Sequence, residues 1–301
     1  MQNKSINILN LKGILIIIIA FGILFANVAQ GAKWVKGIYI TQSTLERTSY
    51  IKKLIKQAKA VGINTFVVDY GYNSSSYRRN IKLLKQNNIR YVARIVVFPY
   101  GGTTAQVRSK AYWQKKYRLA ERAIALGAKE IQLDYVRYKS SQKASVKNIE
   151  NIYKVIKWFK QKLKTKNIPL QVDVFGITGF GRSLHVGQDL QIFADSVDVI
   201  CPMVYPSHYE PYKKHARDPY FIVSETLRAL HAQFPGLLPF KVYPFIEIYN
   251  YRYPLPRNQK LKYIYEQIRA VENNNVDGWY AWSAGNKYYY LFRVLKTYKV
   301  Q

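Results

Sequence analysis

EIQLDYVRY at residues 130–138 and LQVDVF at residues 170–175 repeat one pattern of polar and apolar residues. In both segments a Gln is followed two positions later by an Asp, with apolar residues beside them. Successive side chains of a β-strand point to opposite faces, so residues two apart share a face. Gln132 and Asp134 are therefore predicted to face inward together, and so are Gln171 and Asp173. Two such segments, separated by an amphipathic stretch, are typical of neighbouring strands in an α/β fold.

The same alternation of short apolar runs and amphipathic stretches continues from residue 34 onward, with no Pro-, Gly- or Ser-rich linker. The runs predicted as strands are 35–41, 65–69, 91–98, 131–136, 170–175, 197–203, 241–246 and 278–282. The stretches predicted as helices are 50–61, 78–87, 111–126, 145–166, 186–194, 220–232, 259–274 and 287–298. Eight strands alternating with eight helices predict a single (β/α)8 TIM barrel. A doubly wound open sheet is the alternative, although no Gly-rich phosphate-binding motif follows the first run.

The N-terminal segment has the composition of a secretory signal. Lys4 and Lys12 come before an uncharged apolar run over residues 13–28, and mostly small residues follow it. We therefore expect residues 1–32 to be a signal peptide and residues 33–301 to be the barrel. The expected location is the periplasm, the cell envelope or the extracellular medium. A membrane span needs about 20 apolar residues, so an uncleaved anchor is the alternative, and it would be the only membrane contact.

The amino-acid composition excludes some classes of protein and indicates which partners the chain could have. The 301 residues are 49% hydrophobic, which excludes intrinsic disorder, and the single cysteine, Cys201, excludes an intramolecular disulfide. Lys and Arg number 47 against 17 Asp and Glu, a formal charge of +30, or +28 once Lys4 and Lys12 are removed (30 − 2). This excess indicates either an anionic partner or solubility alone. We expect a monomer without a nucleic-acid partner, because the cations are scattered over helices and no nucleic-acid-binding module is recognisable.

Carboxylates at the predicted strand ends suggest the chemistry, because the active site of such a barrel lies at the carboxyl ends of its strands. Asp134 and Asp173 are predicted to face each other there, with Arg94 on the neighbouring strand able to keep one of them ionised. Asp69 ends the second run and Glu247 follows the seventh. Two such carboxyl groups are the minimum for glycoside hydrolysis: one protonates the leaving oxygen and the other attacks the sugar or activates water. We predict that Asp134 and Asp173 form this pair, with Glu247 as a further candidate; the alternative is a purely structural polar network.

Aromatic and polar residues at the same strand ends are candidates for sugar contacts, because rings can stack on pyranose faces. The predicted substrate-binding residues are Asp69, Arg94, Tyr135, Arg137, Tyr205, His208, Trp282 and Asn286. His208 could equally shape its own loop, and Asn286 could equally cap a helix. We expect no metal and no cofactor, since the four histidines show no paired ligand spacing and there is no Cys-x-x-Cys motif.

Several of these segments together resemble a known family. The segments occur in order and are YVARIVVF (91–98), EIQLDYVRY (130–138), VDVFG (172–176), GQDL (187–190), VDVICPMVYPSHY (197–209) and DGWYAWSAGNKY (277–288). The chain is similar to the bacterial family described as "putative glycosyl hydrolase domain". That resemblance implies a (β/α)8 barrel distantly like the α-amylase type, with a nucleophilic aspartate after strand four and an acid after strand five. These positions correspond to Asp134, as nucleophile or base, and to Asp173 as acid, with Glu247 as the alternative acid.

The chain also departs from this family. DYGYNSSS at residues 69–76 and PYGG at residues 99–102 lack acidic residues that the family has there, and the acid of α-amylase-like barrels is a glutamate, one methylene longer than Asp173. The lost acids suggest either a more basic cleft for an anionic glycan or a barrel that binds without cleaving. The sequence therefore predicts an exported glycoside hydrolase acting on a cell-envelope or matrix polysaccharide. The alternatives are a catalytically silent carbohydrate-binding barrel and, as a third reading, a polyanion binder.

Overall fold

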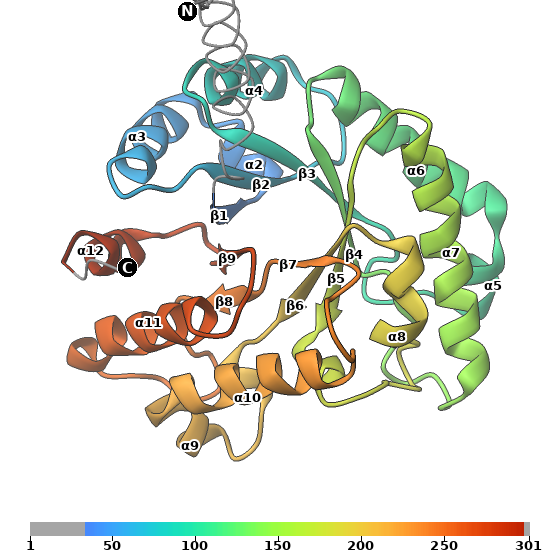
Figure 1. Ribbon diagram of the computed structural model, residues 1–301. Helices are drawn as coiled ribbons and strands as arrows, with labels where there is room; N and C mark the ends of the chain where they lie inside the picture. The colour runs from blue at the N-terminus through green and yellow to red at the C-terminus, as the bar shows by residue number, and fades with distance from the viewer. Residues whose placement is uncertain (1–33, 298–301) are drawn as a thin grey trace, which may run out of the picture. The chain divides into compact units, whose positions relative to one another are not determined.

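A closed parallel β-barrel forms the centre of the computed structural model, which describes residues 34–297 (Figure 1). Its strands are β1 (Val35–Ile40), β2 (Thr65–Asp69), β3 (Arg90–Val96), β4 (Glu130–Asp134), β5 (Leu170–Phe175), β6 (Val199–Met203), β7 (Lys241–Val242), β8 (Phe245–Glu247) and β9 (Gly278–Trp282). All pairings are parallel, and the ring closes through β1 with β9 and β5 with β6. β7 and β8 both pair with β6 and together fill the seventh position, so the predicted (β/α)8 barrel is confirmed.

The break between β7 and β8 falls at Tyr243 and Pro244, inside the single run predicted over 241–246. Proline has no backbone N–H and cannot donate to a strand ladder. The carbonyl of Pro244 still accepts a hydrogen bond from the N–H of Tyr280 on β9 at 2.9 Å. The seventh position of the barrel is therefore continuous in space although its ladder is interrupted.

Helices surround the barrel where the amphipathic stretches predicted them (Figure 1). The long ones are α3 (Thr48–Lys59), α4 (Ser75–Gln86), α6 (Lys110–Ala125), α7 (Val146–Lys164), α10 (Pro219–Ala232), α11 (Arg257–Glu272) and α12 (Tyr289–Thr297). Short helices lie in the connections: α2 (Gln42–Leu45), α5 (Thr104–Arg108), α8 (Leu190–Phe193), α9 (Tyr212–Arg217), and the 3-10 turns η1 (Gly176–Gly179), η2 (Ala194–Ser196) and η3 (Pro206–His208). Within residues 34–297, no helix is both long and apolar enough to cross a bilayer. The predicted signal peptide, residues 1–32, lies outside the described residues.

The helix predicted over 186–194 is wrong in its first half. Gly187 has φ +76°, a left-handed conformation, and the preceding segment forms a turn closed by a bridge between Ser183 and Gln188. A Cβ at Gly187 would lie 2.6 Å from the carbonyl oxygen of Asn148 on α7, so the turn passes too close to the helix for any side chain. The helix begins only at α8, where the Asp189 carboxylate caps two backbone N–H groups.

A layer of polar side chains crosses the barrel interior. Gln132 Nε2 donates to Gln171 Oε1 at 3.0 Å, and Gln171 Nε2 lies 3.2 Å from the hydroxyl of Tyr280. The inward orientation predicted for both glutamines is therefore correct. Because Asp134 and Asp173 lie two residues further along the same strands, they form the next inward layer, toward the carboxyl ends.

Candidate active site

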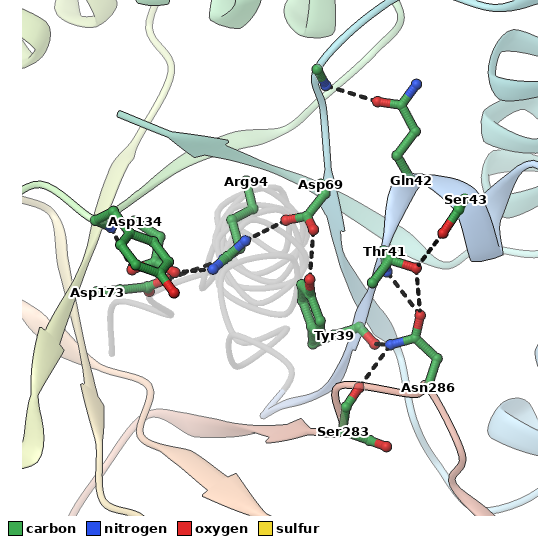
Figure 2. Close-up of polar contacts among 12 residues, drawn as sticks. Tyr39, Thr41, Gln42, Ser43, Asp69, Arg94, Asp134, Asp173, Ser283 and Asn286 are labelled. Atoms are coloured by element: carbon green, nitrogen blue, oxygen red, sulfur yellow. Dashed lines mark hydrogen bonds and ion pairs between the residues drawn. The ribbon is translucent and has the colours of Figure 1, made fainter. Parts of the chain in front are cut away.

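One arginine joins three aspartates at the carboxyl ends of four strands (Figure 2). Arg94 on β3 donates through Nη1 to Asp69 on β2 and through Nη2 to Asp134 on β4. Its Nε lies 3.5 Å from Oδ2 of Asp173 on β5. Only 11% of the Arg94 side chain is exposed, so the guanidinium is almost wholly enclosed by these acids and the barrel wall. The two predicted catalytic carboxyl groups therefore share one cation.

Burial and neighbouring charges shift the pKa values of Arg94 and Asp173. Burial alone would lower the pKa of Arg94, but the charges of Asp69, Tyr39 and Asp173 raise it overall, so this side chain stays cationic. Burial raises the pKa of Asp173 to about 8, against the opposing effect of Arg94. Asp173 therefore carries a proton at neutral pH, and its Oδ1 has no hydrogen-bond partner among the described residues.

Asp134 has two hydrogen-bond donors on its carboxyl oxygens. Its Oδ2 accepts the charged hydrogen bond from Arg94, and its Oδ1 accepts the backbone N–H of Tyr135 at 2.5 Å. Both contacts stabilise a carboxylate. Tyr135 itself has φ +52°, so the chain turns sharply directly after β4.

Tyr39 completes the cluster from β1. Its hydroxyl donates to Oδ2 of Asp69 at 2.5 Å, and its ring lies 5.1 Å from the guanidinium carbon of Arg94 (Figure 2). Asp69 thus has a partner on each oxygen and serves to hold Arg94 in place. Tyr39 was not predicted as a site residue, although its position two residues before the end of the first predicted strand, 35–41, was a usable signal.

A cavity of about 400 Å³ opens above this cluster. The predicted site residues that line it are Arg94, Asp134, Tyr135, Arg137, Asp173, Tyr205, His208 and Trp282. Trp282 stacks with Tyr205, with ring centroids 5.3 Å apart and planes inclined by 24°, and with Tyr249, with centroids 5.7 Å apart and planes inclined by 26°. The cavity therefore has a polar floor and a wall of three nearly parallel rings.

Three predicted residues do not line the cavity: Asp69 lies in the Arg94 cluster beneath it, and Glu247 and Asn286 lie elsewhere. Glu247 is fully buried and does not line the cavity. Its carboxylate accepts the Ser207 N–H at 2.8 Å, the Ser207 hydroxyl at 2.7 Å and the Tyr263 hydroxyl at 2.5 Å, so it fixes the loop after β6 to α11. Asn286 is also fully buried, and its amide accepts the Thr41 N–H at 2.9 Å and donates to the Tyr39 carbonyl at 3.1 Å (Figure 2). Both positions join structural elements to one another.

Other lining residues were missed by the sequence analysis. They are Tyr39, Phe175, Gln188, Met203, Phe245, Tyr249 and Tyr251. Tyr249 and Tyr251 follow β8 at alternate positions and could have been found by the same strand-end rule as Trp282. Gln188 was hidden in the wrongly predicted helix; its Oε1 accepts the Phe175 N–H at 3.0 Å and holds that strand end against the turn.

A second hollow of about 280 Å³ adjoins the cavity. Both hollows are lined by Phe175, His208 and Tyr251, and the second adds Tyr212 and Arg252. We call the two together the groove. The second hollow lies beyond the residues of the carboxyl pair, so the groove could hold a ligand longer than one sugar. Within the part of the chain that the structure describes, no group of three or more His, Cys, Asp and Glu side chains is arranged to hold a metal ion.

Comparison with known proteins gives one family and a common fold. The family described as "Putative glycosyl hydrolase domain" matches residues 103–288. A chitinase from Chromobacterium violaceum is 14% identical with a TM-score of 0.64, over 89% of this chain and 99% of that one. The glycoside hydrolase domain of PgaB (BpsB) from Bordetella bronchiseptica is 11% identical with a TM-score of 0.62, over 83% and 94%.

A third solved structure, the spore cortex-lytic enzyme SleL of Bacillus megaterium, is 10% identical with a TM-score of 0.63, over 87% of this chain and 73% of that one. At these identities the similarity concerns the fold. Among curated protein sequences, none matches this chain.

Proposed function

Because this chain belongs to the family described as "Putative glycosyl hydrolase domain", we propose that it hydrolyses the glycosidic bonds of a polysaccharide with Asp134 and Asp173 as its catalytic carboxyl pair. The family match, over 186 of 301 residues (288 − 103 + 1), confirms the family and the enzyme class predicted from the sequence. The observation that carries the proposed residues is the pair itself: two carboxyl groups on one buried guanidinium at the floor of an aromatic cavity, with the pKa of Asp173 raised by burial and Asp134 bound by Arg94 and a backbone N–H.

The proposed reaction needs one carboxyl group of the pair protonated and the other ionised. Asp173 donates its proton to the glycosidic oxygen as the bond to the anomeric carbon breaks. The Asp134 carboxylate either attacks that carbon or removes a proton from the water that does. Arg94 orients both groups and keeps Asp134 ionised. Glu247, which the sequence offered as an alternative acid, has no role in this proposal because its oxygens are occupied by Ser207 and Tyr263.

The substrate is proposed to be a polysaccharide of the cell envelope or matrix. The stacked rings of Tyr205, Trp282 and Tyr249 offer an apolar face to a pyranose, and the groove extends past the carboxyl pair. Proteins of similar fold include a chitinase and a spore cortex-lytic enzyme. Residues 1–32 are proposed to export the chain, on the grounds of their lysines and apolar run.

A reducing-end assay tests the activity. Purified protein is incubated with a panel of cell-envelope and matrix polysaccharides, and new reducing ends are measured over time. We expect release from at least one polysaccharide. Stable binding to a polysaccharide that never gains reducing ends would instead support the silent carbohydrate-binding barrel.

Trp282→Ala is expected to raise KM about 10-fold with a smaller change in kcat, because removing the central ring of the stack costs binding energy of about 1.4 kcal/mol. Trp158→Ala is the matched control: Trp158 is a half-buried tryptophan on α7, packed against Trp113 and Tyr117 outside the barrel. Both variants should lose some stability, as thermal melting will report. Equal KM values for the two variants would contradict a sugar platform at Trp282.

The pH dependence of kcat/KM is expected to show an alkaline limb near pH 8. Asp173 acts as an acid only when protonated, and burial raises its pKa to about 8, so the active fraction is nearly complete at pH 6 and falls as pH rises through 8. Above that point the rate should drop about tenfold per pH unit. Initial rates between pH 5 and 10 check this. A rate that stays constant up to pH 10 would exclude Asp173 as the acid.

A further inference from the structure

A second arginine, Arg137, lines the cavity without serving the carboxyl pair. Its guanidinium carbon lies 5.1 Å from the ring centroid of Tyr135 and 5.2 Å from that of Phe175, so the side chain is held between two rings. Its Nη1 donates to the backbone carbonyl of Tyr138 at 2.9 Å. These contacts fix the position of the guanidinium, but none of them is with a negatively charged group.

The charge environment of Arg137 differs sharply from that of Arg94. Three aspartates surround Arg94, whereas within residues 34–297 no carboxylate oxygen lies within 4.0 Å of an Arg137 nitrogen. Arg137 is half-buried, and burial lowers its pKa, as expected of a cation that has lost water without gaining an acid. A desolvated guanidinium without a counter-ion is costly, and a ligand anion would offset that cost.

Arg252 is exposed, unlike Arg137, but it too lies against two aromatic rings, in the adjoining part of the groove. Its guanidinium carbon lies 5.3 Å from the Tyr212 ring and 5.4 Å from the Tyr251 ring, and across the described chain no carboxylate lies within 4.0 Å of it. Burial, and then the nearby charge of Arg252, lower the pKa of His208 to about 4. His208 is therefore neutral at pH 7. Arg94 is paired with aspartates, so Arg137 and Arg252 are the arginines lining the groove that have no carboxylate partner among the described residues.

We propose that the groove binds an acidic polysaccharide, whose carboxylate or sulfate groups on separate sugars pair with Arg137 and Arg252. This inference rests on the groove being the glycan site of the proposed function, and it adds the chemical class of the glycan. Guanidinium groups bind such planar or tetrahedral oxyanions through two hydrogen bonds at once. Contact with a ring face does not use the in-plane N–H groups of a guanidinium, and of those of Arg137 one, on Nη1, donates to the Tyr138 carbonyl. The overall charge of +30 draws a polyanion toward the surface, and the two stacked arginines give the groove a specific place for it.

The test compares matched acidic and neutral ligands by isothermal titration. One pair is a hexuronan oligosaccharide and the same oligosaccharide with its carboxyl groups reduced to alcohols; the other is dextran sulfate and dextran. The groove variant carries Arg137→Gln and Arg252→Gln together, and the control variant carries Arg79→Gln and Arg118→Gln together. The control pair removes the same two charges from exposed positions on α4 and α6, so it reports nonspecific attraction to a basic protein.

The wild-type protein and the control variant should bind at least one acidic ligand about 10-fold or more tightly than its neutral counterpart, and Arg137→Gln with Arg252→Gln should lose most of that preference. Two results would overturn the inference: equal affinity of the wild type for acidic and neutral ligands, or equal loss in the groove variant and the control variant. Tight binding of an oligothymidylate with the same dependence on the two arginines would overturn the assignment to a glycan. Because dissociation constants need no turnover, failure of this inference is distinguishable from failure of the proposed hydrolysis, which the reducing-end assay measures separately.

Discussion

Arg94→Met is expected to lower the free energy of unfolding by about 3–5 kcal/mol, the loss typical when one partner of a buried ionic cluster is removed. The substitution leaves the carboxyl groups of Asp69, Asp134 and Asp173 close together without their shared cation. Asp173 is 3% exposed and cannot recover this loss by turning to water. Urea unfolding followed by circular dichroism measures the change.

The control for this variant is Arg228→Met. Arg228 pairs with Glu225 on the exposed face of α10, with 61% of the arginine side chain accessible. Exposed pairs of this kind contribute about 1 kcal/mol at most. Similar losses in the two variants would mean that the Arg94 cluster is not the buried ionic centre described above.

Asp134→Asn is expected to reduce kcat by about 10³-fold or more while the chain stays folded. Asparagine keeps the shape of the side chain, and Arg94 keeps two carboxyl partners, so the barrel is preserved. The amide, however, can neither attack an anomeric carbon nor accept a proton from water. Reducing-end release measures the loss, and thermal melting verifies that the variant is folded.

Asp195→Asn provides the matched control for Asp134→Asn. Asp195 is an exposed carboxylate on η2 that accepts the Tyr153 hydroxyl at 2.9 Å, and it is not among the residues that line the groove. Its replacement should leave kcat within about twofold of the wild-type value, as for most surface substitutions away from a site. Normal turnover by Asp134→Asn would remove that residue from the proposed mechanism.

The inward face of the strands could be predicted because the alternation of a β-strand has a fixed period of two. The repeated Gln and Asp in β4 and β5 were read correctly from this rule, and Arg94 followed from it on β3. The closed barrel followed from the count of strand and helix units. These features depend on local periodicity, which a single sequence contains.

The parts that could not be predicted depend on contacts between distant segments. The turn at Gly187 is imposed by close packing against Asn148 on α7, which no local pattern records. Glu247 ends β8 at a position that the strand-end rule assigns to the site, but its oxygens are bound by Ser207 and Tyr263, 40 residues before it and 16 after it. Arg137 was identified only as a candidate contact, because its lack of an acidic partner is a property of the folded groove.

The most direct test of the central claim compares reducing-end release by the wild type, Asp173→Asn and Glu247→Gln, each verified as folded, on a polysaccharide that the wild type cleaves. Asp173 and Glu247 are both buried carboxyl groups whose pKa is raised, to about 8 and about 7, by desolvation, but only Asp173 lines the cavity beside Arg94. We predict that Asp173→Asn loses about 10²-fold or more of the activity and its alkaline limb near pH 8, while folded Glu247→Gln keeps both. Loss of turnover in Glu247→Gln with normal turnover in Asp173→Asn would contradict the account.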